Sequence, residues 1–238
     1  MKPDVFILAA GLGTRLRPLT DTLPKPLVQV NGKPLIAYHL ELLAKEGFSR
    51  VMINLHYLPD KIRDFVGSGS QWGLEVSYSY EPSLLDTGGG VKNIESWIKT
   101  PSLLIINSDS LFDKTLSLST LVSNHLTANS ELTLLVGPGS SGYTPLYIDS
   151  KQELVGFGKD YRPTPDSLAV SYLGVMVLNT SLLKSMPPVG VPFSLTSGII
   201  PGLLSKSEKI NTFSFKNFWS DVGTPKRLEE ASKYFEKS

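Results

Sequence analysis

The N-terminal part of the chain contains the stretch that decides the fold, Val5-Phe-Ile-Leu-Ala-Ala-Gly-Leu-Gly-Thr-Arg-Leu-Arg-Pro-Leu-Thr20, followed shortly by Pro24-Lys-Pro-Leu27. Residues 5–10 are an apolar run rich in strand formers, which predicts a buried parallel strand. Gly11 and Gly13 then allow a tight turn and a close approach of the backbone to a ligand. Because N–H groups exposed at such a turn attract anions, the stretch predicts a phosphate-binding loop at a strand end.

Positive charge is concentrated in the same stretch, at Arg15, Arg17 and Lys25. Over the whole chain of 238 residues, by contrast, 23 basic residues nearly balance 22 acidic ones. A chain with so small a net charge has no general attraction for nucleic acid or for anionic membranes. We therefore expect a local anion site and no nucleic-acid partner.

The composition also excludes several kinds of site. The chain has no cysteine, which rules out thiolate zinc sites, disulfides and cysteine nucleophiles. No apolar run approaches the roughly 18 residues of a membrane span, and Asp4 stands where a signal peptide would begin its apolar segment. We expect a cytoplasmic protein without membrane insertion.

Strand-like and helix-like segments alternate along the first half of the chain. The predicted strands cover residues 5–10, 27–30, 50–55, 74–80 and 103–107, and the predicted helices cover 34–45, 60–66 and 91–98. This alternation is typical of a parallel α/β sheet whose ligands bind at the carboxyl ends of the strands.

The second half has a looser pattern. It predicts helices over 116–129 and 225–235, strands over 132–136, 171–179 and 213–218, a hairpin over 146–155 and a loop over 161–166. These 238 residues show no internal repeat, and we expect no second, solenoid domain.

Two familiar phosphate-binding motifs do not fit the opening loop. A P-loop needs Gly-Lys followed by Ser or Thr, whereas Gly32-Lys33 runs into Pro34. A dinucleotide fingerprint needs a third glycine at position 16, which is leucine. The opening loop therefore matches neither of these two motifs.

The opening stretch, together with later segments of the chain, resembles the sugar-1-phosphate nucleotidyltransferases over nearly the whole length of the chain. After the opening stretch, the matching segments are Glu81-Pro82, Asp86-Thr-Gly-Gly-Gly90, Asn107-Ser-Asp109 and Trp219-Ser-Asp-Val-Gly-Thr-Pro225, in the family's order. The resemblance implies a Rossmann-like mixed, mainly parallel sheet flanked by helices, in one domain over 1–238. It also implies a nucleotide-binding half, about 1–110, and a half for the sugar phosphate and metal, about 111–238.

The resemblance assigns roles to individual residues. Arg15 is expected to hold the departing phosphates and Lys25 to lie near the α-phosphate, both as catalytic residues. Mg²⁺ is expected on Asp109 and Asp221. The expected nucleotide contacts are Leu8, Ala9, Ala10, Gly11, Gly13, Thr14, Arg15, Thr87, Gly88 and Asn107. The expected sugar-phosphate contacts are Glu81, Lys159 and Gly174.

Some positions depart from the family pattern or allow another interpretation. Ser108 stands where the family mostly has glycine, and a serine fits there only if the backbone does not need a positive φ. Gly158 replaces the glutamate that usually precedes the sugar-phosphate lysine. Asp221 also suits the N-cap of the terminal helix. Residues 87–90 are expected to form a turn before a helix, and His56 is expected either to line the nucleotide site or to be structural.

The predicted reaction joins a nucleoside triphosphate to a sugar 1-phosphate and releases pyrophosphate. Length and spacing most resemble compact bacterial uridylyltransferases for N-acetylmuramate 1-phosphate, which favours UTP and that sugar. Short mannose- and heptose-1-phosphate guanylyltransferases are the first alternative, and a phosphocholine-type cytidylyltransferase is another. A non-enzymatic, nucleotide-sensing homologue also remains open. The protein is expected to be a monomer or a homodimer.

Overall fold

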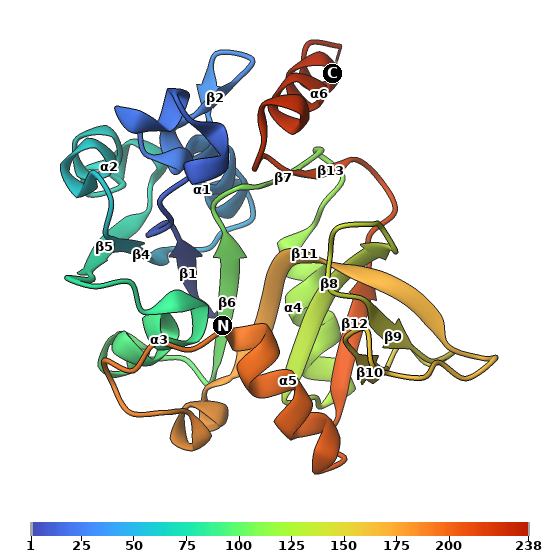
Figure 1. The fold of residues 1–238 in the computed structure, drawn as a ribbon. Helices are drawn as coiled ribbons and strands as arrows, with labels where there is room; N and C mark the ends of the chain where they lie inside the picture. Colours follow the sequence, from blue (N-terminus) through green and yellow to red (C-terminus); the bar gives the residue numbers. More distant parts are fainter. Residues whose placement is uncertain (1, 238) are drawn as a thin grey trace.

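The structure, a computed structural model, describes residues 2–237 and builds them around one nine-stranded sheet (Figure 1). Seven strands follow each other in the order β10, β9, β11, β6, β1, β4 and β5, and β8 pairs with both β11 and β12. The sheet is therefore mixed, as predicted, with its parallel part at the N-terminal side.

The parallel part consists of β1 (Asp4–Leu8), β4 (Arg50–Leu55), β5 (Glu75–Tyr80) and β6 (Ser102–Asn107). Side chains of β1 alternate between two cores: Val5 and Ile7 face one, whereas Phe6 faces the other. The helices α1 (Leu35–Lys45) and α2 (Pro59–Val66) pack in the first core. The helices α3 (Asp86–Asn93) and α5 (Leu195–Ser205) pack in the second. Apolar strands covered on both faces are the pattern that the sequence predicted.

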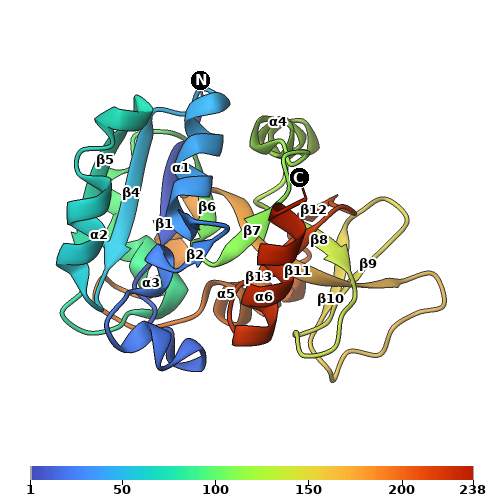
Figure 2. The same ribbon diagram turned by 90° about the horizontal axis from the view of Figure 1, so that it is seen from above.

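The remaining strands of the sheet are joined mainly by antiparallel pairs. The long strand β11 (Leu168–Asn179) pairs antiparallel with β6, β8 (Leu132–Pro138) and β9 (Leu146–Ile148). β9 pairs with β10 (Leu154–Phe157), and β12 (Ile210–Ser214) lies parallel to β8. Figure 2 shows this part beside the parallel one, with the β9–β10 hairpin on the side away from β4 and β5.

Two short antiparallel strand pairs lie outside the nine-stranded sheet. One consists of β7 (Ser110–Phe112) and β13 (Trp219–Asp221), and the other of β2 (Gln29–Val30) and β3 (Lys33–Pro34). The helix α4 (Leu118–Ala128) covers the sheet, and α6 (Pro225–Phe235) ends the described chain. The β7–β13 pair brings the segment after β6 next to a segment more than a hundred residues later. Among residues 2–237, none of the helices combines the length and apolar content needed to cross a lipid bilayer.

Three sequence predictions about elements were wrong. The helix predicted at 91–98 begins at Asp86, so the three glycines before Val91 belong to α3 instead of a preceding turn. The strand predicted at 213–218 is β12 at Ile210–Ser214. The helix α5 was not predicted, because Pro201 lies inside it and interrupts the expected helical pattern.

Candidate active site

A cavity of about 470 Å³ lies at the carboxyl ends of β1, β4 and β6, beside the start of α3. Most of the predicted site residues line it: Leu8, Ala9, Ala10, Gly11, Gly13, Thr14, Arg15, Lys25, Glu81, Thr87, Asn107 and Asp109. This is the edge where ligands bind in open parallel sheets. The volume is within the range of small-molecule sites.

The opening loop is folded back on itself and fixed at Gly13. The backbone of Gly13 has φ 65°, and its carbonyl accepts a hydrogen bond of 2.7 Å from the Thr20 hydroxyl. A Cβ at this position would lie 3.1 Å from the Thr20 methyl and 3.2 Å from the Lys25 Cβ. At Gly11, by contrast, nothing lies within 4 Å of the Cβ position. One glycine therefore closes the loop, and the other leaves room for a ligand to approach the backbone.

Lys25 and Asp109 form an ion pair in the wall of the cavity. Their side chains are 12% and 23% exposed, so both charges are largely shielded from water. Lys25 is held between Pro24 and Pro26 in a short 3-10 turn. Asp109 follows β6, and its carbonyl accepts a 2.8 Å hydrogen bond from the Val222 N–H. Both side chains are thus positioned before any substrate binds.

Asp221 lies on β13 and faces an adjoining cavity of about 630 Å³. Its carboxylate accepts a 2.6 Å hydrogen bond from the Tyr143 hydroxyl and forms an ion pair with Arg227. Burial, and then the Asp221 carboxylate, raise the pKa of Tyr143, so this hydroxyl stays a donor. The N-cap of α6 is Thr224, whose side chain accepts from the Arg227 N–H. The capping role considered for Asp221 is therefore wrong.

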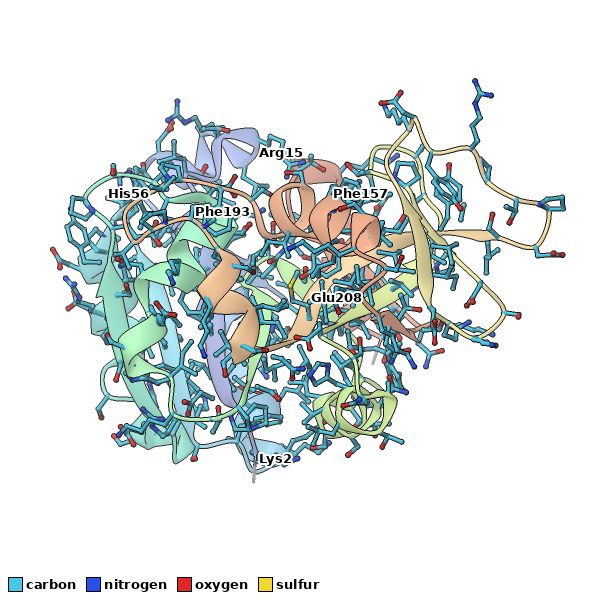
Figure 3. All side chains as sticks on the ribbon, turned by 90° about the horizontal axis from the view of Figure 1, so that it is seen from below. Lys2, Arg15, His56, Phe157, Phe193 and Glu208 are labelled. Atoms are coloured by element: carbon cyan, nitrogen blue, oxygen red, sulfur yellow. The ribbon has the colours of Figure 1, made fainter. Side chains whose placement is uncertain are left out.

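Arg15 connects the two cavities, since it lines both of them. A Cβ at Gly223 would lie only 2.7 Å from the Arg15 guanidinium. The glycine between Asp221 and α6 thus leaves the space that the guanidinium occupies. Figure 3 labels Arg15 on the opening loop, above α3 in that view.

Asp109 and Asp221, the two predicted metal ligands, carry the oxygen donors that Mg²⁺ prefers, and they line two adjoining cavities. The β7–β13 pair sets Asp221 opposite Ser110, directly beside Asp109 in the fold. No group of three or more His, Cys, Asp or Glu side chains arranged for a metal occurs within residues 2–237. A site with two carboxylates that leaves other positions to water and phosphate oxygens is typical of Mg²⁺.

Glu81 lies beneath the cavity in a closed hydrogen-bond network. One of its carboxylate oxygens accepts from the Asn54 amide at 2.8 Å, and the other accepts from the Leu85 N–H at 3.1 Å. The Asn54 side-chain carbonyl in turn accepts from the Ala9 N–H at 2.6 Å. Burial raises the pKa of Glu81. These contacts tie the opening loop to the start of α3 from below.

The glycines at the start of α3 are required by close neighbours. A Cβ at Gly88 would lie 2.2 Å from the ring of Phe193, and the Gly88 N–H donates a 2.8 Å hydrogen bond to the Phe193 carbonyl. A Cβ at Gly90 would lie 2.9 Å from the Glu81 carboxylate. Figure 3 shows Phe193 on the segment that leads into α5, next to α3. The predicted nucleotide contact Gly88 therefore does not line the cavity but lets this segment pack.

Two predicted sugar-phosphate contacts lie away from the cavity wall. Lys159 is exposed just after β10 and lines neither of the two cavities. Gly174 lies within β11 at φ 84°, where a Cβ would come within 2.0 Å of the Ser110 hydroxyl. Ser108 does not adopt a positive φ, so the serine is compatible with the backbone there. The His56 Nδ1–H donates a 2.8 Å hydrogen bond to the Glu81 backbone carbonyl, and His56 does not line the main cavity.

The sequence analysis missed three residues that hold the site together. Asn54 is a buried polar side chain in an otherwise apolar strand, which is a signal that a single sequence does provide. Tyr143 and Arg227 hold Asp221, but they lie in a loop and in a terminal helix. Only the folded arrangement brings these two residues to the carboxylate.

Comparisons with known proteins agree with this geometry. The family model described as "Nucleotidyl transferase" matches residues 4–147. The N-acetylmuramate alpha-1-phosphate uridylyltransferase of Neisseria meningitidis is 33% identical, over 95% of this chain and 95% of the relative. The mannose-1-phosphate guanylyltransferase of Mycobacterium tuberculosis is 29% identical over 96% of this chain, which spans 63% of that relative. The solved structure of HddC from Yersinia pseudotuberculosis complexed with GMP-PN has a TM-score of 0.80 at 27% identity, covering 98% of this chain and all of that one.

Proposed function

Since the chain belongs to the nucleotidyl transferase family and is a nucleotidyltransferase, we propose that it transfers UMP from UTP to N-acetylmuramate 1-phosphate and releases pyrophosphate. The observation that carries the choice of substrates is the similarity to the Neisseria uridylyltransferase, which extends over nearly the full length of both chains. The cavity between the opening loop and Asp109 supports the reaction type.

In this reaction an oxygen of the sugar phosphate attacks the α-phosphorus of UTP. The new bond joins that oxygen to the α-phosphorus, and the bond from the α-phosphorus to the bridging oxygen of the leaving pyrophosphate breaks. Such a step needs positioning and charge neutralisation more than covalent help from the protein. The largely shielded Lys25 and the exposed Arg15 are the cations of the cavity that would provide both.

Each residue of the cavity has a place in this proposal. The backbone from Ala10 to Thr14 binds the triphosphate, and Arg15 neutralises the departing pyrophosphate. Lys25 lies close to the α-phosphate, where charge builds up during the transfer. Mg²⁺, when bound at Asp109 and Asp221, supplies further charge neutralisation for the phosphate oxygens.

We also propose a division of the single domain. Residues up to about 110 bind the nucleotide, and residues from about 111 bind the sugar phosphate and the metal. Two residues cross this division: Asp109, a proposed metal ligand, lies at the end of the nucleotide half, and Glu81, predicted to contact the sugar phosphate, lies on the nucleotide side. The buried network of Glu81 supports a bracing role instead.

The experiment measures pyrophosphate release from five nucleoside triphosphates, each combined with a panel of sugar 1-phosphates and with phosphocholine in the presence of Mg²⁺. We expect release with UTP and N-acetylmuramate 1-phosphate, and a product with the mass of the corresponding UDP-sugar. Release with GTP and mannose 1-phosphate only would replace this substrate pair by the guanylyltransferase alternative. Nucleotide binding by calorimetry without any turnover would instead favour the sensing homologue.

A further inference from the structure

The two carboxylate oxygens of Asp221 have different surroundings. Oδ1 accepts a 2.6 Å hydrogen bond from the Tyr143 hydroxyl and a second hydrogen bond from Nη1 of Arg227. Oδ2 accepts no hydrogen bond from any residue within 2–237. It is also not one of the fully buried polar atoms without a partner in that range, so solvent reaches it. The protein therefore holds one oxygen of Asp221 and leaves the other available to a cation.

The pairing of Arg227 with Asp221 is one-sided. Arginine and carboxylate side chains frequently pair through two parallel N–H···O bonds that use both oxygens. Here Arg227 donates to Oδ1, the same oxygen that Tyr143 already uses. A bidentate pair would occupy Oδ2 as well. The observed contact compensates the charge of Asp221 and still leaves Oδ2 without a donor.

Tyr143 is fixed against the strand that carries Asp221. It is the half-buried residue of an otherwise exposed stretch, 138–144. Its ring centroid lies 5.4 Å from that of Trp219, which belongs to β13 together with Asp221. The Arg227 guanidinium, from the first turn of α6, lies over the Tyr143 ring at 5.0 Å. These ring contacts fix the direction from which the hydroxyl approaches Oδ1.

The backbone of Asp221 is held separately, by the β7–β13 pair. Asp221 lies opposite Ser110 in this pair, and the next N–H, of Val222, donates to the Asp109 carbonyl. These bonds place the Asp221 backbone but do not set the rotation of its carboxylate, because the last torsion of an aspartate has only a broad preference. The orientation of the carboxylate therefore depends on Tyr143 and Arg227.

Asp109 has the same division of its oxygens. Lys25 donates to Oδ2 of Asp109, and Oδ1 accepts no hydrogen bond from any residue within 2–237. Each of the two proposed metal ligands thus keeps one oxygen free of protein donors. Mg²⁺ prefers oxygen ligands and keeps several of its waters, so two single oxygens are a suitable donor set.

We infer that Tyr143 and Arg227 are positioning residues that together clamp Oδ1 of Asp221 and so present Oδ2 to the divalent metal. The inference rests on the metal role of Asp221 in the proposed function. Groups that hydrogen-bond to a metal-binding side chain orient it, and their loss typically weakens metal binding 10- to 100-fold. The clamp joins the loop before β9 to the start of α6 through one carboxylate oxygen.

The test measures metal binding without turnover. Mg²⁺ is titrated in the presence of a nucleotide analogue with a methylene group between the α- and β-phosphorus, and the rise in unfolding temperature is recorded. Analogues of UTP and GTP are compared, and the one that stabilises the protein more is used. We expect a Mg²⁺-dependent rise for the unaltered protein. Its absence would overturn the inference and the metal role, whereas pyrophosphate release by the unaltered protein tests the proposed transfer separately.

The variant Tyr143→Phe removes the hydroxyl and keeps the ring. The Mg²⁺ concentration for half-saturation should rise roughly 10-fold, and kcat should recover at saturating Mg²⁺ with an unchanged KM for the sugar 1-phosphate. Tyr147→Phe is the matched control, because Tyr147 also contacts another ring but lines neither cavity. A raised KM for the sugar 1-phosphate at saturating Mg²⁺ would overturn the inference, since Tyr143 would then contact the substrate.

The ligand-free unfolding temperature separates positioning from simple stabilisation. Tyr143→Phe loses one hydrogen bond, so a small decrease of this temperature is expected, and each titration is referred to the variant's own metal-free value. A decrease combined with the half-saturation of the unaltered protein would mark a structural role and overturn the inference.

The variant Arg227→Lys tests the other half of the clamp at constant charge. It removes the planar guanidinium that lies over the Tyr143 ring, so half-saturation by Mg²⁺ should rise by up to about 10-fold. The reverse exchange, Lys226→Arg, is the control at the next residue, whose side chain is 86% exposed. Because both donors act on one oxygen, the double variant Tyr143→Phe/Arg227→Lys should weaken binding by less than the product of the single effects. Single effects that multiply fully would overturn the shared clamp.

Discussion

The substitution Gly174→Ala tests how β11 is fitted to the active-site edge. Gly174 lies where the pairing of β11 with β8 shifts register, between Tyr172 and Met176. Its φ is 84°, and a Cβ would come within 2.0 Å of the Ser110 hydroxyl and 3.2 Å of the Asn107 Cβ. A side chain at this position therefore meets both backbone strain and a collision.

The two costs can be assigned separate magnitudes. A left-handed backbone costs an alanine about 1–2 kcal/mol relative to glycine. Forcing an extra methyl group into a packed site costs about 1–3 kcal/mol more. Gly174→Ala should thus lower the free energy of unfolding by roughly 2–5 kcal/mol, a large part of the stability of an ordinary domain.

Urea unfolding of a small set of variants separates the two costs. Gly190→Ala is the matched control: Gly190 has φ 88° and nothing within 4 Å of its Cβ position, so only the backbone cost of about 1–2 kcal/mol applies. Adding Ser110→Gly to Gly174→Ala removes the collision and should recover about 1–3 kcal/mol in a double-mutant cycle. The reasoning is refuted if Gly174→Ala costs no more than Gly190→Ala, or if Ser110→Gly restores nothing.

Three further predictions concern charge. Asp109→Asn should lower kcat by about 10²- to 10³-fold and weaken the response to added Mg²⁺. Pyrophosphate release measures both effects, and Asp64→Asn, at an exposed position, is the control. Near-normal turnover of Asp109→Asn would remove Asp109 from the metal role. Lys25→Ala should lower kcat about 10- to 100-fold with a smaller change in KM for UTP, as measured by steady-state kinetics. An unchanged kcat would contradict the catalytic role of Lys25. Burial lowers the pKa of His125 below its ordinary 6.5, so the unfolded chain takes up a proton there before the folded one does. The free energy of unfolding should therefore decrease as pH falls below 6.5, and His125→Gln should flatten this dependence in urea titrations between about pH 7 and pH 5.

Local patterns were sufficient for the elements whose ends carry their own signals. The helix α6 has Thr224 as its N-cap and Pro225 in its first turn, and α1 follows Pro34 directly. In the same way, Val51, Met52, Ile53 and Leu55 make β4 mostly apolar, and the polar His56 follows it. These segments were predicted within a residue or two because the signals lie inside them.

Other elements depend on contacts that no local pattern contains. The three-residue strands β7 and β13 are stable only as a pair across more than a hundred residues. The early start of α3 is a further case, since glycines are poor helix formers. Glycines are nevertheless required in the first turns of α3, because Phe193 and Glu81 fill the space that side chains at Gly88 and Gly90 would need.

Some residues of the candidate site could likewise be predicted from the sequence, and others could not. The opening loop and Asp109 follow buried strands of a parallel sheet, so topology alone sends them to one edge. Lys159 lies on a hairpin that pairs only with the distal part of the sheet, and no spacing in the sequence fixes where such a hairpin points.

The ion pairs of the ligand-free site explain how so many charges are kept in a shielded place. Asp109 is neutralised by Lys25 and Asp221 by Arg227, so neither carboxylate is left uncompensated before substrate binds. We expect Lys25 to exchange the Asp109 carboxylate for a phosphate oxygen when the nucleotide enters with its metal, which keeps the lysine paired throughout. Because the exchange replaces one anionic partner by another, it adds little desolvation cost to substrate binding. The loss of Lys25 should for this reason appear in the rate of transfer more than in nucleotide affinity.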